Sequence, residues 1–131
     1  MKNNLTIFYT DDDVVDQEIF EEIILSINKD ISLRLFESGE ELINALNTAS
    51  IQPDLLLIDL NMPGKNGFDV LLDLQQLNKK NLPPVIIFTT SSSEMHKHEA
   101  NKLGATLFIE KPRHYETFVK TLHSIISTAL S

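Results

Sequence analysis

The sequence predicts an α/β fold in which a doubly wound, five-stranded parallel sheet lies between two helical layers, a three-layer (βα)5 sandwich. The first observation is that strand-like apolar runs and helical apolar stripes alternate five times along the 131 residues. The second is that residues 55–58 and 85–88 are apolar at every position, as in strands buried on both faces. The third is that no linker or repeat interrupts the chain, so we expect one domain over residues 1–131.

The first two strand–helix units lie in the first half of the chain. Residues 5–10 form an apolar run, and apolar side chains then recur every four residues over 15–27, which indicates an amphipathic helix. Residues 31–36 alternate as a strand does. Ser38 and Glu41 have the spacing of a capping box, in which each side chain binds the backbone N–H of the other, and so predict the start of the second helix.

The second half of the chain continues this alternation. Ser91 and Glu94 repeat the capping-box spacing and predict the start of the fourth helix. The other expected elements are a strand at 55–58, a helix from 68, a strand at 85–88, the end of the fourth helix near 104, a strand at 106–109 and a helix over 118–129.

Composition limits the classes of function. The net charge is −8, with 19 acidic against 11 basic residues, which opposes attraction to nucleic acid or to an anionic membrane surface. The absence of cysteine excludes disulfides, cysteine nucleophiles and thiolate metal sites. The N-terminus does not have the pattern of a signal peptide, and no apolar run reaches the ~20 residues that cross a bilayer. We therefore expect a cytoplasmic protein with neither nucleic acid nor membrane as a partner.

Polar residues follow four of the predicted strands. They are Asp11, Asp12 and Asp13 after the first strand, Asp59 after the third, Thr89 and Thr90 after the fourth, and Lys111 after the fifth. In an open parallel sheet all strands point their carboxyl ends at one edge, which is where ligands bind. We therefore expect acidic groups, a hydroxyl and an ammonium to meet at this edge.

This combination of groups points to phosphoryl chemistry with a metal ion. Carboxylates packed together repel one another, and a hard cation between them relieves the repulsion. Mg²⁺ prefers oxygen ligands, including one or two carboxylates and a phosphate. An aspartate can act as a nucleophile toward phosphorus and form an aspartyl phosphate. The cation would neutralise the oxygens of the transferred group, and Lys111 and a threonine hydroxyl would hold the others.

Each of these residues also has an ordinary structural interpretation. Asp13 suits the N-cap of the first helix better than a metal site. Asp11 and Asp12 read alone are equally consistent with solvated loop acids. Asp59 alone is compatible with a turn cap, and Lys111 with a plain lysine at a strand end. The functional interpretation is favoured because these residues meet at the same edge under one fold.

Four stretches, IFYTDDD, LLLIDLNMPGKNG, VIIFTTSS and FIEKP, together resemble the receiver domain of bacterial two-component response regulators. The resemblance covers essentially the whole chain, and the motifs occur in the order of that family. It implies the CheY-like member of the flavodoxin-like folds. It also implies a phosphoprotein of signal transduction that catalyses its own phosphorylation and dephosphorylation with Mg²⁺ or Mn²⁺ and is not an enzyme toward other substrates.

The resemblance assigns the metal-binding and acceptor roles residue by residue. Asp59 is implied as the phosphoacceptor and as one metal ligand. Asp12 would bind the metal directly, and Asp11 would act mainly through water. Asn61 would offer its backbone carbonyl to the metal.

The resemblance also implies how the signal leaves the site. Thr89 is the implied switch hydroxyl, Phe108 the switch aromatic and Lys111 the lysine that pairs with the phosphate. The peptide bond between Lys111 and Pro112 is implied to be cis. The surface that changes would comprise the fourth helix, the fifth strand and the fifth helix, roughly residues 93–129.

Two positions depart from the usual pattern of the family. Thr90 stands where many members have alanine and would narrow access to the phosphoryl group. Arg113 and His114 stand where small or apolar residues are common, and the sequence assigns them no role.

The favoured function is a stand-alone phosphoacceptor, monomeric or weakly dimeric, that takes a phosphoryl group from a histidine kinase or a histidine phosphotransfer protein and then binds an unidentified protein. The sequence leaves open whether it acts as a chemotaxis-like effector or as a phosphorelay intermediate. One alternative is a Mg²⁺-dependent phosphohydrolase with an aspartate nucleophile, but such enzymes typically resemble a DxD motif with a cap domain, and Asn61 takes the place of the second acid here. A further alternative is a degenerate receiver that binds partners without phosphorylation, which the intact acids, Thr89 and Lys111 oppose.

Overall fold

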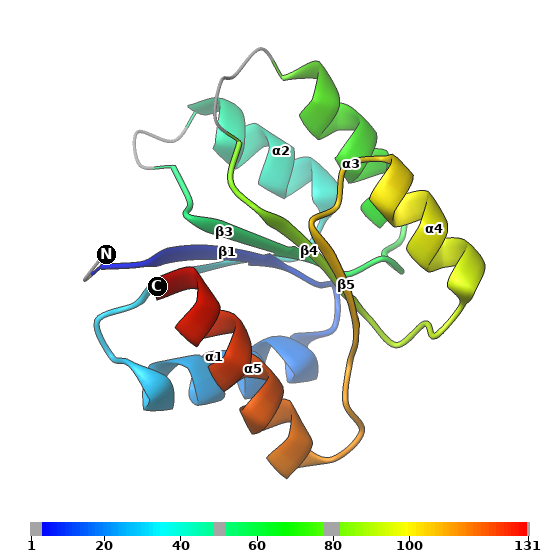
Figure 1. Ribbon diagram of the computed structural model, residues 1–131. Helices are drawn as coiled ribbons and strands as arrows, with labels where there is room; N and C mark the ends of the chain where they lie inside the picture. Colours follow the sequence, from blue (N-terminus) through cyan, green and yellow to red (C-terminus); the bar gives the residue numbers. More distant parts are fainter. Residues whose placement is uncertain (1–3, 49–51, 78–81, 131) are drawn as a thin grey trace.

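The computed structural model describes residues 4–48, 52–77 and 82–130 of the chain. All strands in these residues belong to one parallel sheet with the spatial order β2-β1-β3-β4-β5 (Figure 1). The strands are β1 Thr6–Thr10, β2 Ser32–Phe36, β3 Leu55–Ile58, β4 Val85–Thr89 and β5 Leu107–Glu110. The predicted five-stranded parallel sheet is confirmed, and each strand ends within one residue of the predicted positions.

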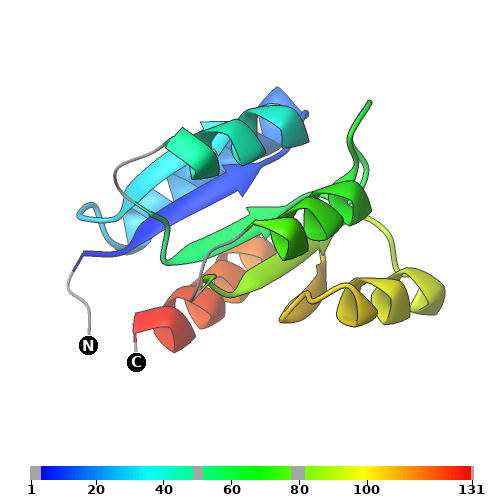
Figure 2. The same cartoon turned by 90° about the horizontal axis from the view of Figure 1, so that it is seen from above.

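Helices cover both faces of the sheet, as a parallel sheet requires. The helices are α1 Val14–Ile27, α2 Gly39–Thr48, α3 Gly67–Gln76, α4 Glu94–Lys102 and α5 Tyr115–Leu130. α1 and α5 pack on one face, and α2, α3 and α4 follow one another across the other face (Figures 1 and 2). Within the described residues, no helix combines the length and the apolar content that crossing a bilayer requires.

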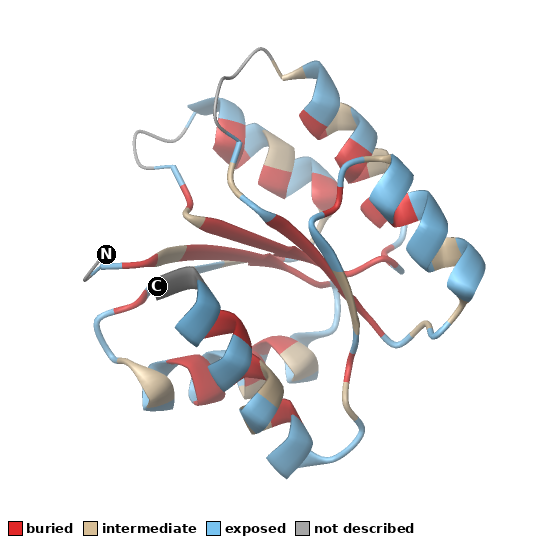
Figure 3. Ribbon diagram, viewed as in Figure 1, coloured by how far each residue is buried: buried red, intermediate tan, exposed pale blue. Residues whose placement is uncertain are grey.

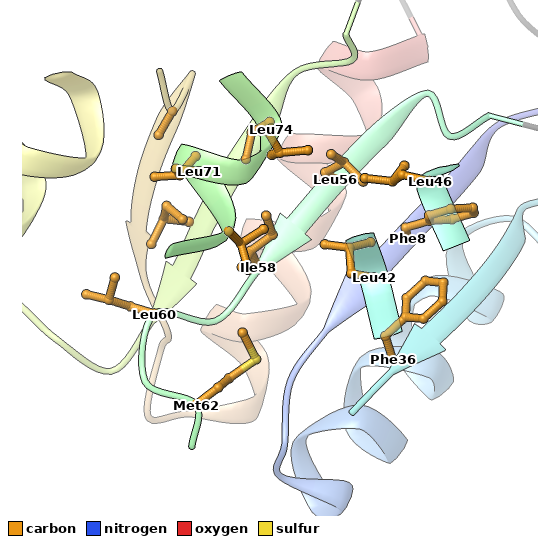
Figure 4. Close-up of a cluster of buried hydrophobic side chains, with 14 of the residues drawn as sticks. Phe8, Phe36, Leu42, Leu46, Leu56, Ile58, Leu60, Met62, Leu71 and Leu74 are labelled. Carbon is orange, nitrogen blue, oxygen red and sulfur yellow. The ribbon is translucent and has the colours of Figure 1, made fainter. Parts of the chain in front are cut away.

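The core consists of two apolar clusters, one on each side of the sheet (Figure 3). Every residue of the central strands β3 and β4 is buried, which explains why these two runs of the sequence are apolar throughout. The edge strands β2 and β5 keep exposed positions because each has only one neighbouring strand. Figure 4 shows the cluster under α2 and α3, where Leu56 and Ile58 of β3 lie near Leu42, Leu71 and Leu74.

Two of the predicted capping residues lie immediately before the first turns of α1 and α2. Asp13 caps α1, because its carboxylate accepts the N–H groups of the first helical turn at 2.9 and 3.2 Å. The interpretation of Asp13 as an N-cap is therefore confirmed. Ser38 accepts the N–H of Glu41 at 3.2 Å, but the Glu41 carboxylate binds the N–H of Glu37 instead of returning to Ser38. Only half of the predicted capping box is formed.

The start of α4 differs from the prediction. Ser93, not Ser91, is the N-cap, and its hydroxyl accepts the N–H of His96 at 3.3 Å. The hydroxyl of Ser91 instead accepts the N–H of Ser93 at 3.2 Å. Each residue in a run of three serines can cap a helix, so the path of the loop after β4 decides which one does.

Candidate functional site

Four polar side chains are buried together at the carboxyl edge of the sheet. They are Asp11 after β1, Asp59 after β3, Thr89 at the end of β4 and Lys111 after β5, and each is at most 7% exposed. The strand order reverses direction between β1 and β3, which is the position where open α/β sheets bind ligands. The sheet therefore brings the predicted residues together at the predicted place.

Lys111 is the centre of the site, because its ammonium group contacts three carboxylates. Its Nζ lies 2.6 Å from Oδ2 of Asp11, 2.9 Å from Oδ2 of Asp16 and 3.4 Å from Oδ2 of Asp59. Burial lowers the pKa of Lys111, but the hydrogen bonds to Asp11 and Asp16 and the charges of its acidic neighbours outweigh it and hold the pKa above its ordinary value. The lysine therefore carries a full positive charge within this group of acids.

Asp11 is held by the protein through both of its carboxylate oxygens. Oδ2 accepts the hydroxyl of Tyr9 at 2.5 Å as well as the Lys111 ammonium, and Oδ1 accepts the N–H of Asp13 at 2.9 Å. Burial raises the pKa of Tyr9, and the negative charge of Asp11 adds to this effect, so the phenol remains a donor. Tyr9 itself is fixed by stacking on Phe20, with 4.1 Å between the ring centroids.

Three of the acids also form a group that could hold a cation. One oxygen from each of Asp11, Asp12 and Asp59 lies within 4.8 Å of the others. Asp12 is exposed, whereas Asp11 and Asp59 are buried. A hard divalent cation accepts this set of oxygen donors, with water filling its other positions. The donor set therefore fits Mg²⁺ or Mn²⁺.

Asp59 has an unusual electrostatic environment. Burial raises its pKa to about 6, with Lys111 lowering it and Asp11 raising it further. Burial thus makes the charged form of Asp59 costly even beside Lys111. A divalent cation bound next to the carboxylate would favour its charged form.

The loop after Asp59 is held close to the sheet. The N–H of Asp59 donates to the carbonyl of Thr10 at 2.9 Å, and Oδ1 of Asp59 accepts the N–H of Asn61 at 3.3 Å. The N–H of Gly67 donates to the carbonyl of Leu60 at 2.9 Å, and a Cβ on Gly67 would lie 2.9 Å from the Cα of Leu60. Only glycine permits this close return of the chain.

Asn66 and Asp69 fix the far end of this loop. Each side chain binds the backbone N–H of the other at 3.0 Å, which makes a full capping box at the start of α3. The sequence does not predict this box, because Asn66 and Asp69 differ from the usual pairing of serine or threonine with glutamate or glutamine. Asn61 is exposed at the mouth of the loop, two residues after Asp59.

Hydroxyl groups line the other side of the site, at the end of β4 and on the loop that follows it. Oγ1 of Thr89 accepts the N–H of Ser91 at 3.2 Å. Oγ of Ser91 lies 2.7 Å from Nδ1 of His96, whose ring packs edge-on against Phe68 with 5.7 Å between the centroids. Thr90, the next residue, is exposed.

Phe108 lies one strand away from Thr89 on the same face of the sheet. It pairs with Ile87 in the β4–β5 register, and Ile87 and Thr89 are two residues apart and so face the same side. Phe108 is half-buried and packs against the cluster beneath α2, α3 and α4. The two predicted switch residues therefore face the same side of adjacent strands, two positions apart in the register.

The peptide bond after Lys111 corrects one expectation. The described residues contain no cis peptide bond, so the expectation of a cis bond between Lys111 and Pro112 is wrong for this structure. The trans form is the lower-energy isomer of a bond before proline, and Lys111 already reaches its three carboxylates with it. Arg113 and His114, which follow, are exposed.

Sequence reasoning missed three participants in the site. Asp16 reads as a favourable acid in the first turn of a helix, and only the fold brings it to Lys111, 95 residues away. Tyr9 reads as a core residue of a strand, with no signal for its hydroxyl bond. His96 reads as a polar residue on an exposed helix, with no sequence signal for its contact with Ser91.

Comparisons with known proteins agree with this geometry. The model of the response regulator receiver domain family matches residues 7–123. PilH of Pseudomonas aeruginosa is 36% identical over 76 residues, which are 58% of this chain and 63% of PilH. The chain thus spans less than two thirds of the length of several curated relatives that it matches. The response regulator Rcp1 of Synechocystis is 26% identical over 126 residues, covering 92% of this chain and 86% of Rcp1.

Solved structures agree on the fold. The phosphorylated cyanobacterial phytochrome response regulator RcpA superimposes with a TM-score of 0.90 at 23% identity and covers 98% of this chain and 95% of that one. The Mn²⁺-bound form of Rcp1 superimposes with a TM-score of 0.84 at 26% identity, over 94% of this chain and 92% of that one. On the family match and the shared fold, this chain belongs to the response regulator receiver domain family.

Proposed function

We propose that this protein is a stand-alone phosphoacceptor switch. It takes a phosphoryl group from a histidine kinase or a histidine phosphotransfer protein onto Asp59 and then binds a protein partner in a changed form. The observation that carries the proposal is the buried Asp59 carboxylate, which lies between the acids that follow β1 and the ammonium of Lys111.

A divalent cation is part of this proposal. When bound, Mg²⁺ or Mn²⁺ would neutralise the charge that develops on the phosphoryl oxygens. Asp12 and Asp59 would bind it directly, together with the backbone carbonyl of Asn61. Asp11 would act mainly through water, because both of its oxygens already accept protein hydrogen bonds. The Mn²⁺ reported for Rcp1, a protein of the same fold, supports such a metal.

The chain's own residues account for the transfer. An oxygen of Asp59 forms the new bond to phosphorus while the phosphorus–nitrogen bond of the donor phosphohistidine breaks, and the imidazole leaves with the electron pair. Lys111 would donate to one phosphoryl oxygen and Thr89 to another. No other enzymatic activity is needed, because the same groups would position a water molecule for the slow hydrolysis that resets the protein.

The output of the switch would pass through Thr89 and Phe108. If the Thr89 hydroxyl moves to the phosphoryl group, the space it leaves can be filled by Phe108, which lies on the same face of the neighbouring strand. The surface formed by α4, β5 and α5 would then change its packing. This surface exposes the large apolar side chains Met95, Leu107 and Tyr115, as a partner-binding face would.

A groove beside this surface adds room for a partner. It has a volume of about 770 Å³ and is lined by α5, by β5 and by residues at the starts of β3 and β4, including Leu55, Ile109 and Ile125. The net charge of −8 disfavours nucleic acid as the partner, so we propose a protein, or a weakly bound second copy of the chain. A kinase-linked switch of this kind would operate in the cytoplasm.

Phosphorylation by a small phosphodonor tests the proposal. Acetyl phosphate with Mg²⁺ should add one phosphoryl group, visible by intact-protein mass spectrometry and removed by hydroxylamine, which cleaves acyl phosphates. Chelation of the metal should prevent the addition. Asp59→Asn should abolish it, whereas Asp30→Asn, the same change at an exposed loop residue, should leave it intact. Full labelling of the Asp59→Asn protein at another residue would refute the assignment.

The metal assignment has its own test. Asp12→Ala should weaken Mg²⁺ binding more than Asp11→Ala, measured by isothermal titration calorimetry. The reason is that Asp12 is exposed and has its oxygens available, whereas those of Asp11 are occupied. A stronger effect of Asp11→Ala would show that Asp11 is the direct ligand.

A further inference from the structure

The contact between Asp16 and Lys111 is not needed to explain phosphoryl acceptance, yet it is one of the closest ion pairs of the site. Asp16 belongs to the first turn of α1, and its Oδ2 lies 2.9 Å from Nζ of Lys111. We infer that Asp16 is a positioning residue that holds Lys111 toward α1 in the resting protein and competes with the phosphoryl group for it. This inference rests on the proposed function of Asp59.

Lys111 has no donor left over for a phosphoryl oxygen. An ammonium group has three N–H donors, and three carboxylate oxygens stand around this one. The contact to Asp59, at 3.4 Å, is the longest of the three. The side chain of Lys111 is 6% exposed, so water cannot easily supply a replacement partner. Binding a phosphoryl group therefore requires that one existing contact be given up.

Of the two shorter contacts of Lys111, the one to Asp16 can be given up more easily than the one to Asp11. Its side chain is 28% exposed, whereas that of Asp11 is fully buried, so Asp16 can be hydrated when the lysine leaves. The N-terminus of α1 also favours a negative charge in its first turn without the lysine. Asp11, by contrast, would be left as a buried charge with one donor fewer, which is costly.

The competition between Asp16 and the phosphoryl group for Lys111 affects the free energy of the phosphorylated state. Where a phosphoryl oxygen takes the N–H that Asp16 holds, the contact to Asp16 opposes the phosphorylated state by the free energy of a partly exposed ion pair. This exchange also removes the ammonium from the first turn of α1. Through Asp16, the start of α1 is therefore coupled to the state of Asp59.

The test uses beryllofluoride, BeF₃⁻, as a stable analogue of the phosphoryl group, in the presence of saturating Mg²⁺. Asp16→Asn should bind BeF₃⁻ about threefold more tightly than the wild type, because a partly exposed ion pair no longer competes. Asp16→Glu keeps the charge and should restore an affinity near that of the wild type. Glu18→Gln, the same loss of charge at an exposed position of α1, should change the affinity much less.

A double-mutant cycle shows whether Asp16 acts through Lys111. When Lys111 is already replaced by methionine, Asp16→Asn should increase the affinity for BeF₃⁻ only by the small charge effect that Glu18→Gln causes. An undiminished gain there, or an equal gain from Glu18→Gln, would overturn the inference in favour of a general charge effect. So would an unchanged or weaker affinity of Asp16→Asn in a protein whose thermal unfolding shows that it is folded.

The outcomes separate this inference from the proposed function. A wild-type protein that binds no BeF₃⁻ with Mg²⁺ refutes both. A wild-type protein that binds it, with an Asp16→Asn variant that binds it no better, leaves the phosphoacceptor function standing and refutes only the role of Asp16.

Discussion

The two sides of the site are built from different chemistry. On one side, which we call the charged wall, Asp11, Asp16 and Asp59 surround the ammonium of Lys111 at 2.6 to 3.4 Å. On the other side, the hydroxyl wall of Thr89 and Ser91, the Thr89 hydroxyl accepts one backbone N–H at 3.2 Å. A ligand must exchange strong contacts at the charged wall, whereas a single neutral bond restrains Thr89. The charged wall thus decides whether the ligand binds, and the hydroxyl wall can move in response.

The largest expected effect comes from removing the ammonium. Lys111→Met leaves the buried carboxylates of Asp11 and Asp59 without their cation, so the free energy of unfolding should fall by about 3 kcal/mol in metal-free buffer. Urea denaturation at pH 7 measures it. Lys120→Met, at an exposed position of α5, is the control and should have little effect. A loss as small as that of the control would mean that the charged wall does not depend on Lys111.

Mg²⁺ should raise the free energy of unfolding by nearly as much as Lys111→Met lowers it. Binding to the native state alone raises the free energy of unfolding by about 2.7 kcal/mol at a concentration of 100 Kd. The rise in melting temperature should be lost in Asp12→Ala and retained in Thr89→Ala, because the cation belongs to the charged wall. Added NaCl of matched ionic strength is the control. An equal rise with NaCl would indicate general screening of charge.

The pH dependence of the free energy of unfolding measures the contribution of the Asp59 carboxyl group. In the metal-free native protein its pKa is about 6, whereas an aspartate in the unfolded chain titrates near pH 4. The native state therefore binds more protons between these values, and stability falls as the pH rises through this window. Asp59→Asn removes this contribution, so its stability relative to the wild type should grow from near zero below pH 4 to roughly 2 kcal/mol at pH 7. A constant difference across this range would refute the raised pKa.

The smallest effect on stability is expected at the hydroxyl wall. Thr89→Ala removes the acceptor of one N–H and should cost about 1 kcal/mol, whereas Thr89→Ser should cost less. Thr89→Ala and Phe108→Ala should still accept phosphate. Both should lose the change in amide NMR signals of α4 and β5 that BeF₃⁻ causes in the wild type. If both variants keep that change, the response leaves the site by another route, and α1, which contacts Lys111 through Asp16, is the next one to test.

The sequence predicts the site well where each residue has a fixed place relative to a strand. Asp11, Asp59, Thr89 and Lys111 each end or follow a strand, and the parallel sheet alone brings them together. The apolar runs that specify the strands are long enough to set their ends within one residue. Local patterns therefore suffice for this part of the fold and of the site.

The features that the sequence did not predict depend on how helices, strands and loops are placed relative to one another. Asp16 lies in a helix and meets Lys111 only because the fold brings the first turn of α1 to the residue that follows β5. The cap of α4 depends on which of three equivalent serines the loop after β4 brings to the helix. The cis and trans isomers of the Lys111–Pro112 bond differ too little in free energy for the sequence to decide between them.

The bond between Tyr9 and Asp11 has a practical consequence for optical spectroscopy. The chain has no tryptophan and two tyrosines, so Tyr9 and Tyr115 are its fluorophores. Tyr9 is fully buried with its hydroxyl on Asp11, and Tyr115 is 56% exposed at the start of α5. A tyrosine hydrogen-bonded to a carboxylate is quenched, so a cation that draws on Asp11 should brighten Tyr9, while Tyr115 senses a partner at its own surface. The intrinsic fluorescence of the unlabelled protein thus comes from one tyrosine at the buried site and a second tyrosine on the surface of α5.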